Sequence, residues 1–246
     1  MLTIVVPMAG RGSRFSDAGF VDPKPLILVA GVPMIQLVIE NLTPSRPHRF
    51  VFICQAAHVE AYGLEEKLAR WAPGCVIVRL NGVTEGAACT VLEADFGGGP
   101  LMIANSDQYV GVAIDDYLAR MDGHDGLIMT MQADDPKWSF VGFDAEGRVD
   151  RVVEKQVISN EATVGIYNFA SGGDFRRAAE TMIAEDRRVN GEFYVAPVYN
   201  ELIGQGARIA TFNVGAEADG MYGLGTPADL AIFLAAGVAP ARSDAP

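Results

Sequence analysis

Glycine and cationic residues gather near the start of the chain in a pattern suited to binding phosphate groups. The apolar stretch LTIVVP at residues 2–7 is followed directly by MAGRGSRF at residues 8–15. Glycine lets successive backbone N–H groups approach phosphate oxygens because it carries no Cβ. Arg14 and Lys24 add positive charge, and the prolines on both sides of Lys24 restrict their neighbours to extended geometry. The pattern predicts a loop that holds the polyphosphate of a nucleotide.

Two better-known phosphate-binding motifs are excluded. A Walker A loop has Lys-Ser or Lys-Thr directly after its second glycine, whereas Gly12 is followed by Ser13 and Arg14. The dinucleotide fingerprint requires a third small residue where this chain has Phe15. A tight strand-to-loop turn is the alternative for the two glycines alone, and the proline-flanked Lys24 favours phosphate binding.

Further along, charged residues stand at the ends of predicted strands. Asp107 follows the strand 100–104, where a carboxylate is suited to hold Mg²⁺ together with substrate phosphate oxygens. A turn cap is the alternative. Glu154 and Lys155 close the strand 148–154, and since adjacent strand residues point to opposite faces, one faces a ligand while the other packs sideways or is solvated. A surface charge pair is the alternative here.

Two more residues could bind a ligand. Gly165 lies inside the strand 161–169, where either a close ligand or a bulge explains a glycine. Glu192 lies near the start of a predicted helix, where it either stabilises the helix dipole or binds a hydroxyl group. The three histidines, His48, His58 and His124, are read as surface or loop residues.

The predicted elements of the first half alternate between strands and helices. Continuous apolar runs predict strands at 2–7, 49–54, 75–80, 100–104 and 126–132, with helices at about 33–42, 58–71, 86–95 and 113–121. Such alternation is typical of a doubly wound α/β fold with a mostly parallel sheet. Ligands of such sheets bind beyond the carboxyl ends of the strands.

The second half is predicted to form a small antiparallel lobe that completes the sheet. Strands are expected at 138–144, 148–154, 161–169 and 207–213, and helices at about 172–185, 192–204 and 226–236. We expect a single domain over 1–236, with halves at about 1–135 and 136–236, and a disordered tail at 237–246.

The composition narrows the function further. With 19 Lys and Arg against 31 Asp and Glu, the net charge of −12 argues against a nucleic-acid partner. The chain lacks an apolar run of about 18 residues and a signal-type start, so we expect a cytoplasmic protein without a membrane partner. The three cysteines have no metal-type spacing and are expected to be reduced.

Taken together, these motifs resemble the sugar-phosphate nucleotidyltransferases, also called nucleoside diphosphate-sugar pyrophosphorylases, which have a Rossmann-like nucleotidyltransferase fold. The resemblance covers nearly the whole chain. It is carried, in the family's order, by Gly10–Phe15, Pro23–Pro25, Gly86–Ala88, Asn105–Asp107, Glu154–Lys155, Gly165–Tyr167 and Gly225–Pro227.

The resemblance implies a role for each matching residue. Arg14 would neutralise departing pyrophosphate, Lys24 would contact the transferred phosphate and Asp107 would bind Mg²⁺. Lys155 would bind the acceptor phosphate. The acceptor site would comprise Glu154, Lys155, Gly165 and Glu192, and the nucleotide site Met8, Ala9, Gly10, Arg11, Gly12, Ser13, Asn81, Gly86, Ala87 and Ser106.

Two positions depart from the family pattern. Many members have a second metal-binding aspartate where this chain has Leu224, so Mg²⁺ rests on Asp107 and substrate, or Asp219 takes over. The glutamine with which several members read the base is missing from residues 81–88, which leaves the nucleobase open.

We therefore expect an enzyme that joins a nucleoside monophosphate to a phosphorylated acceptor, with release of pyrophosphate. A sugar 1-phosphate in surface-polysaccharide precursor synthesis is the first expectation. The alternatives are a cytidylyltransferase for a non-sugar phosphorylated alcohol or amine, a glycosyltransferase that uses a nucleotide sugar, and a non-catalytic nucleotide-sensing subunit. The oligomeric state, a homo-oligomer included, stays open.

Overall fold

A computed structural model describes residues 1–10 and 12–238. From residue 239 on, the predicted tail lies outside the described residues. The strands are β1 Leu2–Pro7, β2 Leu28–Val29, β3 Val32–Pro33, β4 His48–Gln55, β5 Val76–Leu80, β6 Leu101–Ala104, β7 Gln108–Val110, β8 Gly126–Gln132, β9 Ser139–Phe143, β10 Val149–Glu154, β11 Glu161–Phe169, β12 Ile209–Glu217 and β13 Gly220–Gly223.

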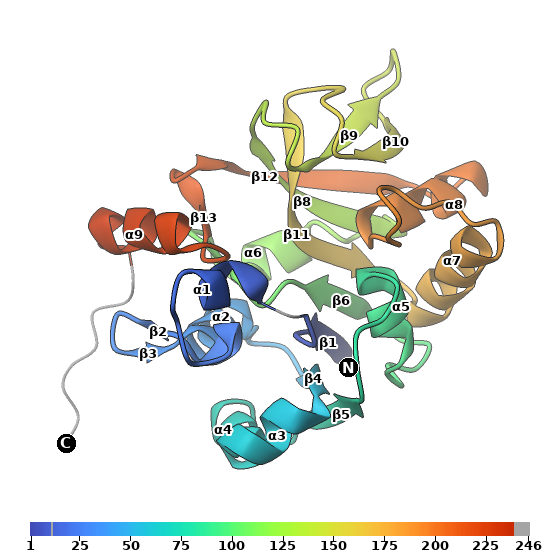
Figure 1. The fold of residues 1–246 in the computed structure, drawn as a ribbon. Helices are drawn as coiled ribbons and strands as arrows, with labels where there is room; N and C mark the ends of the chain where they lie inside the picture. The colour runs from blue at the N-terminus through green and yellow to red at the C-terminus, as the bar shows by residue number, and fades with distance from the viewer. Residues whose placement is uncertain (11, 239–246) are drawn as a thin grey trace.

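Eleven of these strands form one sheet, with the order β5-β4-β1-β6-β11-β8-β12-β13-β7 and the pair β9 and β10 branching beside β11 (Figure 1). In the first half, β1 pairs in parallel with β4 and β6, and β4 with β5. The central strands β1, β4 and β6 are rich in buried apolar residues because helices cover both faces. The loops that follow β1 and β6 therefore start at the same edge of the sheet.

Antiparallel pairing begins at β11, which runs between β6 and β8. The register of β11 against β8 shifts between Thr163 and Tyr167, around Gly165. β9 and β10 form an antiparallel hairpin that meets β11. The predicted α/β fold, with a mostly parallel central sheet and an antiparallel lobe, is confirmed.

Helices cover both faces of the sheet. Their bounds, including the 3₁₀ helices η1 and η2, are α1 Ser13–Asp17, η1 Lys24–Leu26, α2 Met34–Leu42, α3 Ala56–Tyr62, α4 Leu64–Trp71, α5 Ala87–Leu92, α6 Ile114–Ala119, α7 Gly172–Ala184, η2 Ala196–Val198, α8 Tyr199–Gly204 and α9 Pro227–Ala236. One core contains residues of α2, α3, α4, α6 and α9, and the other contains residues of α5, α7 and α8 (Figure 1). Among the helices of the described residues, none combines the length and the apolar character that crossing a bilayer requires.

Two predicted helices were wrong in extent. The predicted helix 58–71 is two helices, since Gly63 adopts φ +58° and separates α3 from α4. The predicted helix 192–204 begins later, because backbone hydrogen bonds hold Glu192 to Val189 and Phe193 to Glu85 in extended geometry. The helix α1 and the short strands β2, β3, β7 and β13 were not anticipated.

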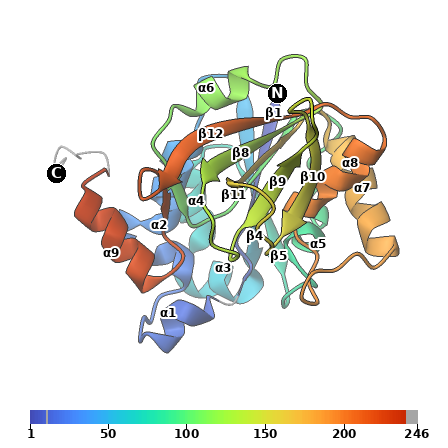
Figure 2. The ribbon, with the colours of Figure 1, turned by 90° about the horizontal axis from the view of Figure 1, so that it is seen from above.

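An asparagine side chain joins α8 to the hairpin of the antiparallel lobe. Asn200 Nδ2 donates to the carbonyl oxygen of Val152 at 2.8 Å, and Asn200 Oδ1 accepts from the N–H of Val152 at 2.8 Å. Val152 is almost completely buried, and α8 lies beside β10 (Figure 2). This side chain takes the place of a neighbouring strand on the outer edge of β10.

We expect Asn200→Ala to lower the free energy of unfolding by about 1–3 kcal/mol, because two buried backbone groups lose their partner. Urea denaturation measures the change. Asn160→Ala, at an exposed turn position, is the control and should change stability by less than about 0.5 kcal/mol. Equal effects of the two variants would contradict this account.

Candidate functional site

The described residues of the glycine loop, 8–10 and 12, lie between β1 and α1 at the carboxyl edge of the sheet. The N–H of Met8 donates to the carbonyl oxygen of Ile53 at 2.9 Å, which continues the pairing of β1 with β4. Gly12 adopts φ +63° and precedes α1, and a Cβ on it would lie 3.4 Å from the Cβ of Lys24. The loop therefore packs directly against the lysine that the sequence singled out. Arg11, predicted for the nucleotide site, lies outside the described residues.

A cavity of about 520 Å³, here called the loop cavity, opens beside this loop. It brings together four of the predicted nucleotide-binding residues, Ala9, Gly10, Gly86 and Ala87. The other predicted members do not line it within the described residues. Met8 and Ser106 are buried, Gly12 is half-buried, and Ser13 and Asn81 are exposed.

Gly86 has a structural reason to be glycine. Its φ is +146°, and a Cβ would lie 2.3 Å from the carbonyl oxygen of Phe193. The hydroxyls of Thr84 and Thr90 both donate to the carbonyl oxygen of Gly86, at 2.9 and 3.1 Å. Backbone hydrogen bonds from Phe193 to Glu85 and from Ala88 to Phe193 hold this wall of the loop cavity against the segment that carries Glu192.

Gln55, which the sequence reading missed, ties two walls of the site together. Its Nε2 donates to the carbonyl oxygens of Ala9 and Gly82, at 2.5 and 2.8 Å. The glycine loop is thus fixed relative to residues 82–87. A lone glutamine at the end of a strand carries no recognisable motif, so only the pairing of β1 with β4 reveals its role.

Lys24 and Asp107 form an ion pair at the same edge of the sheet. Lys24 Nζ donates to Asp107 Oδ2 at 2.8 Å, and both side chains are about a quarter exposed. Lys24 is the first residue of the 3₁₀ helix η1. The extended geometry that the two prolines predicted is therefore found at Pro23 but not at Lys24. A Cβ on Gly225 would lie 2.7 Å from Asp107 Oδ2, which explains a glycine at that position.

A second cavity of about 430 Å³, here called the lysine cavity, contains the predicted acceptor residues Glu154, Lys155, Gly165 and Glu192. Lys155 leaves the strand with φ +55°. Both Glu154 and Lys155 therefore line the cavity, although adjacent residues of a regular strand would point to opposite faces. Arg14, expected beside the nucleotide, also lines the lysine cavity.

The ammonium group of Lys155 is held in place by Tyr194. Its Nζ donates to the hydroxyl of Tyr194 at 2.6 Å and lies 4.8 Å from the centroid of the ring. The hydrogen bond raises the pKa of Lys155, and the nearby Glu154 and Glu192 act in the same direction. Lys155 is therefore a positioned cation that can bind an anionic group.

Glu154 is a buried carboxyl on the floor of the lysine cavity. It accepts a hydrogen bond from Ser139 Oγ, and its side chain is nearly inaccessible to solvent. Burial raises its pKa above the ordinary 4.5, and the hydrogen bond from Ser139 and the charge of Lys155 oppose that shift.

Glu192 lines both cavities and belongs to no helix. It forms an isolated antiparallel bridge with Val189. The helix-dipole interpretation of this residue is therefore excluded, whereas its position between the cavities is compatible with ligand binding.

Of the positions that the sequence put forward for a metal ion, Asp107, Leu224 and Asp219, Asp107 lies beside Lys24, which in turn lies against the glycine loop. Leu224 donates its N–H to the carbonyl oxygen of Asp107 at 2.8 Å, but its side chain is fully buried in the core. Asp219 lies in the tight turn between β12 and β13. The described residues contain no group of three or more His, Cys, Asp or Glu side chains arranged for a metal.

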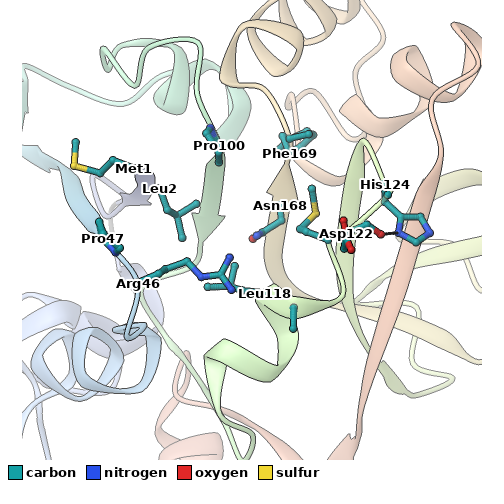
Figure 3. A pocket seen from close by; sticks show the side chains of 14 residues that line it. Met1, Leu2, Arg46, Pro47, Pro100, Leu118, Asp122, His124, Asn168 and Phe169 are labelled. Atoms are coloured by element: carbon teal, nitrogen blue, oxygen red, sulfur yellow. Dashed lines mark hydrogen bonds between the residues drawn. The ribbon is translucent and has the colours of Figure 1, made fainter.

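The largest of the three cavities, about 630 Å³, lies at the opposite edge of the sheet, where β1 and β6 begin (Figure 3). Leu2, Arg46, Leu118 and Phe169 line it, and the side chain of Asn168 points into it. None of the predicted site residues within the described part of the chain reaches this cavity. The predicted site residues that line a cavity therefore line the two smaller ones, whereas Lys24 and Asp107 line neither of them.

The buried Glu154 predicts a pH-dependent stability. A carboxyl whose pKa is higher in the folded than in the unfolded protein contributes stability below the unfolded pKa, and this is lost as pH rises through the folded pKa. Glu154→Gln has no ionisable carboxyl, so it does not lose this stability as pH rises, and its amide oxygen can still accept the hydrogen bond from Ser139. We expect the variant to melt about 2–4 °C above the wild type at neutral pH, as ~1 kcal/mol would give.

Thermal unfolding followed by circular dichroism between about pH 4 and pH 8 measures this difference, which should shrink toward the acidic end. Glu60→Gln, at an exposed position on α3, is the control. A difference that stays constant with pH would show that burial of the carboxylate is not its cause.

Comparison with known proteins agrees with this geometry. Residues 4–194 match the family model described as nucleotidyl transferase. A search among curated protein sequences found no match. The nucleoside-diphosphate-sugar pyrophosphorylase of Vibrio cholerae RC9 is 27% identical, with a TM-score of 0.80, over 94% of this chain and 99% of that chain.

Two more solved structures share the fold at 16% identity and a TM-score of 0.71 each. One is a putative glucose-1-phosphate thymidylyltransferase from Bacillus anthracis, matched over 100% of this chain and 98% of that chain. The other is the inositol-1-phosphate CTP transferase from T. maritima, matched over 98% and 97%. Because the family model spans most of the chain and agrees with the glycine loop, the protein belongs to the nucleotidyl transferase family.

Proposed function

We propose that the protein transfers a nucleoside monophosphate from a nucleoside triphosphate to a phosphorylated acceptor and releases pyrophosphate. The observation that carries the proposal is that the loop cavity and the lysine cavity share Ala87, Asn105 and Glu192 in their walls. Backbone groups suited to a triphosphate lie on one side, and Lys155 lies on the other. Two anionic substrates can meet at this shared wall.

The nearby cations offset the repulsion between these substrates. Lys155 binds the acceptor phosphate, and Lys24 contacts the phosphate that is transferred. Arg14, although it lines the lysine cavity here, lies on the short helix after the glycine loop and compensates charge on the triphosphate. Such preorganised charge is often the largest contribution to catalysis.

Asp107 is suited to bind a magnesium ion that takes few of its ligands from the protein. Mg²⁺ is commonly bound through one or two carboxylates together with substrate phosphate oxygens, and Asp107 is a single, partly exposed carboxylate at a strand end. When bound, the ion would neutralise charge on the phosphates. Leu224 contributes no ligand.

The reaction itself requires alignment more than acid-base chemistry. An oxygen of the acceptor phosphate attacks the α-phosphorus, the bond to the oxygen that bridges to the β-phosphate breaks, and that oxygen leaves with pyrophosphate. A phosphate monoester already carries about 1.5–2 negative charges near neutral pH, so no general base is needed. The site accordingly uses cations and a carboxylate.

A sugar 1-phosphate is the acceptor that we propose first, as a precursor for surface polysaccharide. The second candidate is a cytidylyltransferase for a non-sugar phosphorylated alcohol or amine, and an inositol-1-phosphate CTP transferase shares the fold. The family match favours either of these over a glycosyltransferase or a non-catalytic subunit.

The test is a matrix of four nucleoside triphosphates against a panel of phosphorylated acceptors, read by pyrophosphate release. The panel contains hexose 1-phosphates, glycerol phosphate, inositol phosphate, phosphoethanolamine and phosphocholine. We expect strong release in one or a few combinations and none without an acceptor. Release that does not depend on the acceptor phosphate would contradict the proposal.

The ion pair between Lys24 and Asp107 predicts opposite effects of one substitution. Lys24→Ala should slow turnover by about 10²–10³-fold, since it removes a cation that faces the reacting phosphates. It should also raise the affinity of the nucleotide-free protein for Mn²⁺ by about tenfold, because the carboxylate of Asp107 loses its competing partner.

Pyrophosphate release measures the first effect, and electron paramagnetic resonance of added Mn²⁺ measures the second. Asp107→Ala should abolish the Mn²⁺ site, and Lys67→Ala on α4 should change neither quantity. Unaltered Mn²⁺ binding in Lys24→Ala would mean that Lys24 does not compete with a cation at Asp107.

A further inference from the structure

Two amide side chains converge over a glycine in the wall of the lysine cavity. Gly165 has φ +79° in the irregular part of β11. A Cβ built on it would lie 2.2 Å from Asn105 Nδ2 and 2.4 Å from Gln108 Oε1. Because Gly165 has no side chain, both amides can occupy the space above it. In the sequence, Asn105 and Gln108 flank Ser106 and Asp107.

The amide of Gln108 is buried without a partner for its oxygen. Only 7% of the residue is exposed, and Oε1 has no hydrogen bond in the described part of the chain. Gln108 lines the lysine cavity, and Asn105 lines both cavities. A buried carbonyl without a donor destabilises the protein, which indicates that a bound molecule supplies one.

Trp138 presents the complementary case in the same cavity. Its indole Nε1 is buried and has no acceptor within the described residues. The cavity thus combines an unpaired acceptor, Gln108 Oε1, with an unpaired donor, Trp138 Nε1. The ammonium of Lys155 donates one of its three hydrogen bonds to Tyr194, so the other two are available for a phosphate.

Hydroxyl groups can satisfy either unpaired atom, since a hydroxyl can donate to Gln108 Oε1 or accept from Trp138 Nε1. A protonated amine only donates, and a quaternary ammonium group does neither. Compounds with several hydroxyl groups close to the phosphate therefore match the cavity best, whether the carbon skeleton is a sugar ring or an open-chain polyol.

We propose that Gln108, together with Asn105 and Trp138, selects a polyhydroxylated phosphate as the acceptor by binding its hydroxyl groups over Gly165. This inference rests on the proposed function, because it describes the acceptor of that reaction. Gln108 and Trp138 are specificity-determining residues that hold the acceptor while Lys155 binds its phosphate.

The experiment compares Gln108→Met and Trp138→Phe with the wild type. Methionine resembles glutamine in length but has no amide, and phenylalanine keeps an aromatic ring without the indole N–H. Gln36→Met on α2 and Trp71→Phe on α4 are the matched controls outside the cavity. Each protein is assayed with hexose 1-phosphates, their single deoxy analogues, glycerol phosphate, inositol phosphate and phosphocholine.

The wild type should use a polyhydroxylated phosphate at least about a hundredfold better, in kcat/KM, than phosphocholine. It should also lose about tenfold or more on one deoxy analogue. Gln108→Met should lower kcat/KM for the preferred acceptor by about tenfold or more and abolish that discrimination. KM for the triphosphate should stay unchanged, and the controls should behave as the wild type does.

Three results would overturn the inference alone: phosphocholine as the best acceptor, unchanged discrimination in Gln108→Met, or equal losses on all acceptors in Gln108→Met and Trp138→Phe. Because Trp138→Phe tests the same preference separately, a folding defect in one variant still leaves the other as a test. Absence of pyrophosphate release with every combination in the wild type would overturn the proposed function as well.

Discussion

The site depends on gathering scarce positive charge at one edge of an acidic protein. With a net charge of −12, the chain as a whole repels phosphates. The parallel strands β1 and β6 end at the same edge, which places Lys24 against both Gly12 and Asp107. Lys155 reaches the neighbouring cavity from β10, held by Tyr194. This convergence supplies the positive charge that the proposed reaction between two anionic substrates requires.

Glycines allow the segments that carry these side chains to approach one another closely. At Gly86, Gly165 and Gly225, a Cβ would come within 2.2 to 2.7 Å of backbone or polar side-chain atoms. The neighbours at these points are the backbone of Phe193, the two amides near the cavities, and the carboxylate of Asp107. Each glycine thus allows a polar group to lie where a side chain would otherwise be, and these groups line or support the site.

Much of the fold and part of the site could be predicted from the sequence, because the strands β1, β4, β6 and β8 are short apolar runs with helical segments between them. The division of α3 from α4 could not, since it depends on the left-handed conformation of Gly63, which the helical pattern of residues 58–71 does not reveal. Nor could the start of α8, since the segment before it is held by a backbone hydrogen bond from Phe193 to the distant Glu85. Gln55 was missed for the same reason. Its partners, Ala9 and Gly82, lie on other loops of the carboxyl edge.

By itself, the sequence determined the alternation of strands and helices, the glycine loop and the types of charged residue available for chemistry. Those properties depend on local composition and spacing. Only the tertiary structure decided that Lys24 pairs with Asp107, 83 residues away, that Glu154 and Lys155 share one cavity, and that Asn105 and Gln108 meet over Gly165. Such contacts depend on strand order and on single backbone torsions, which bring distant segments together and leave no periodic trace in the sequence.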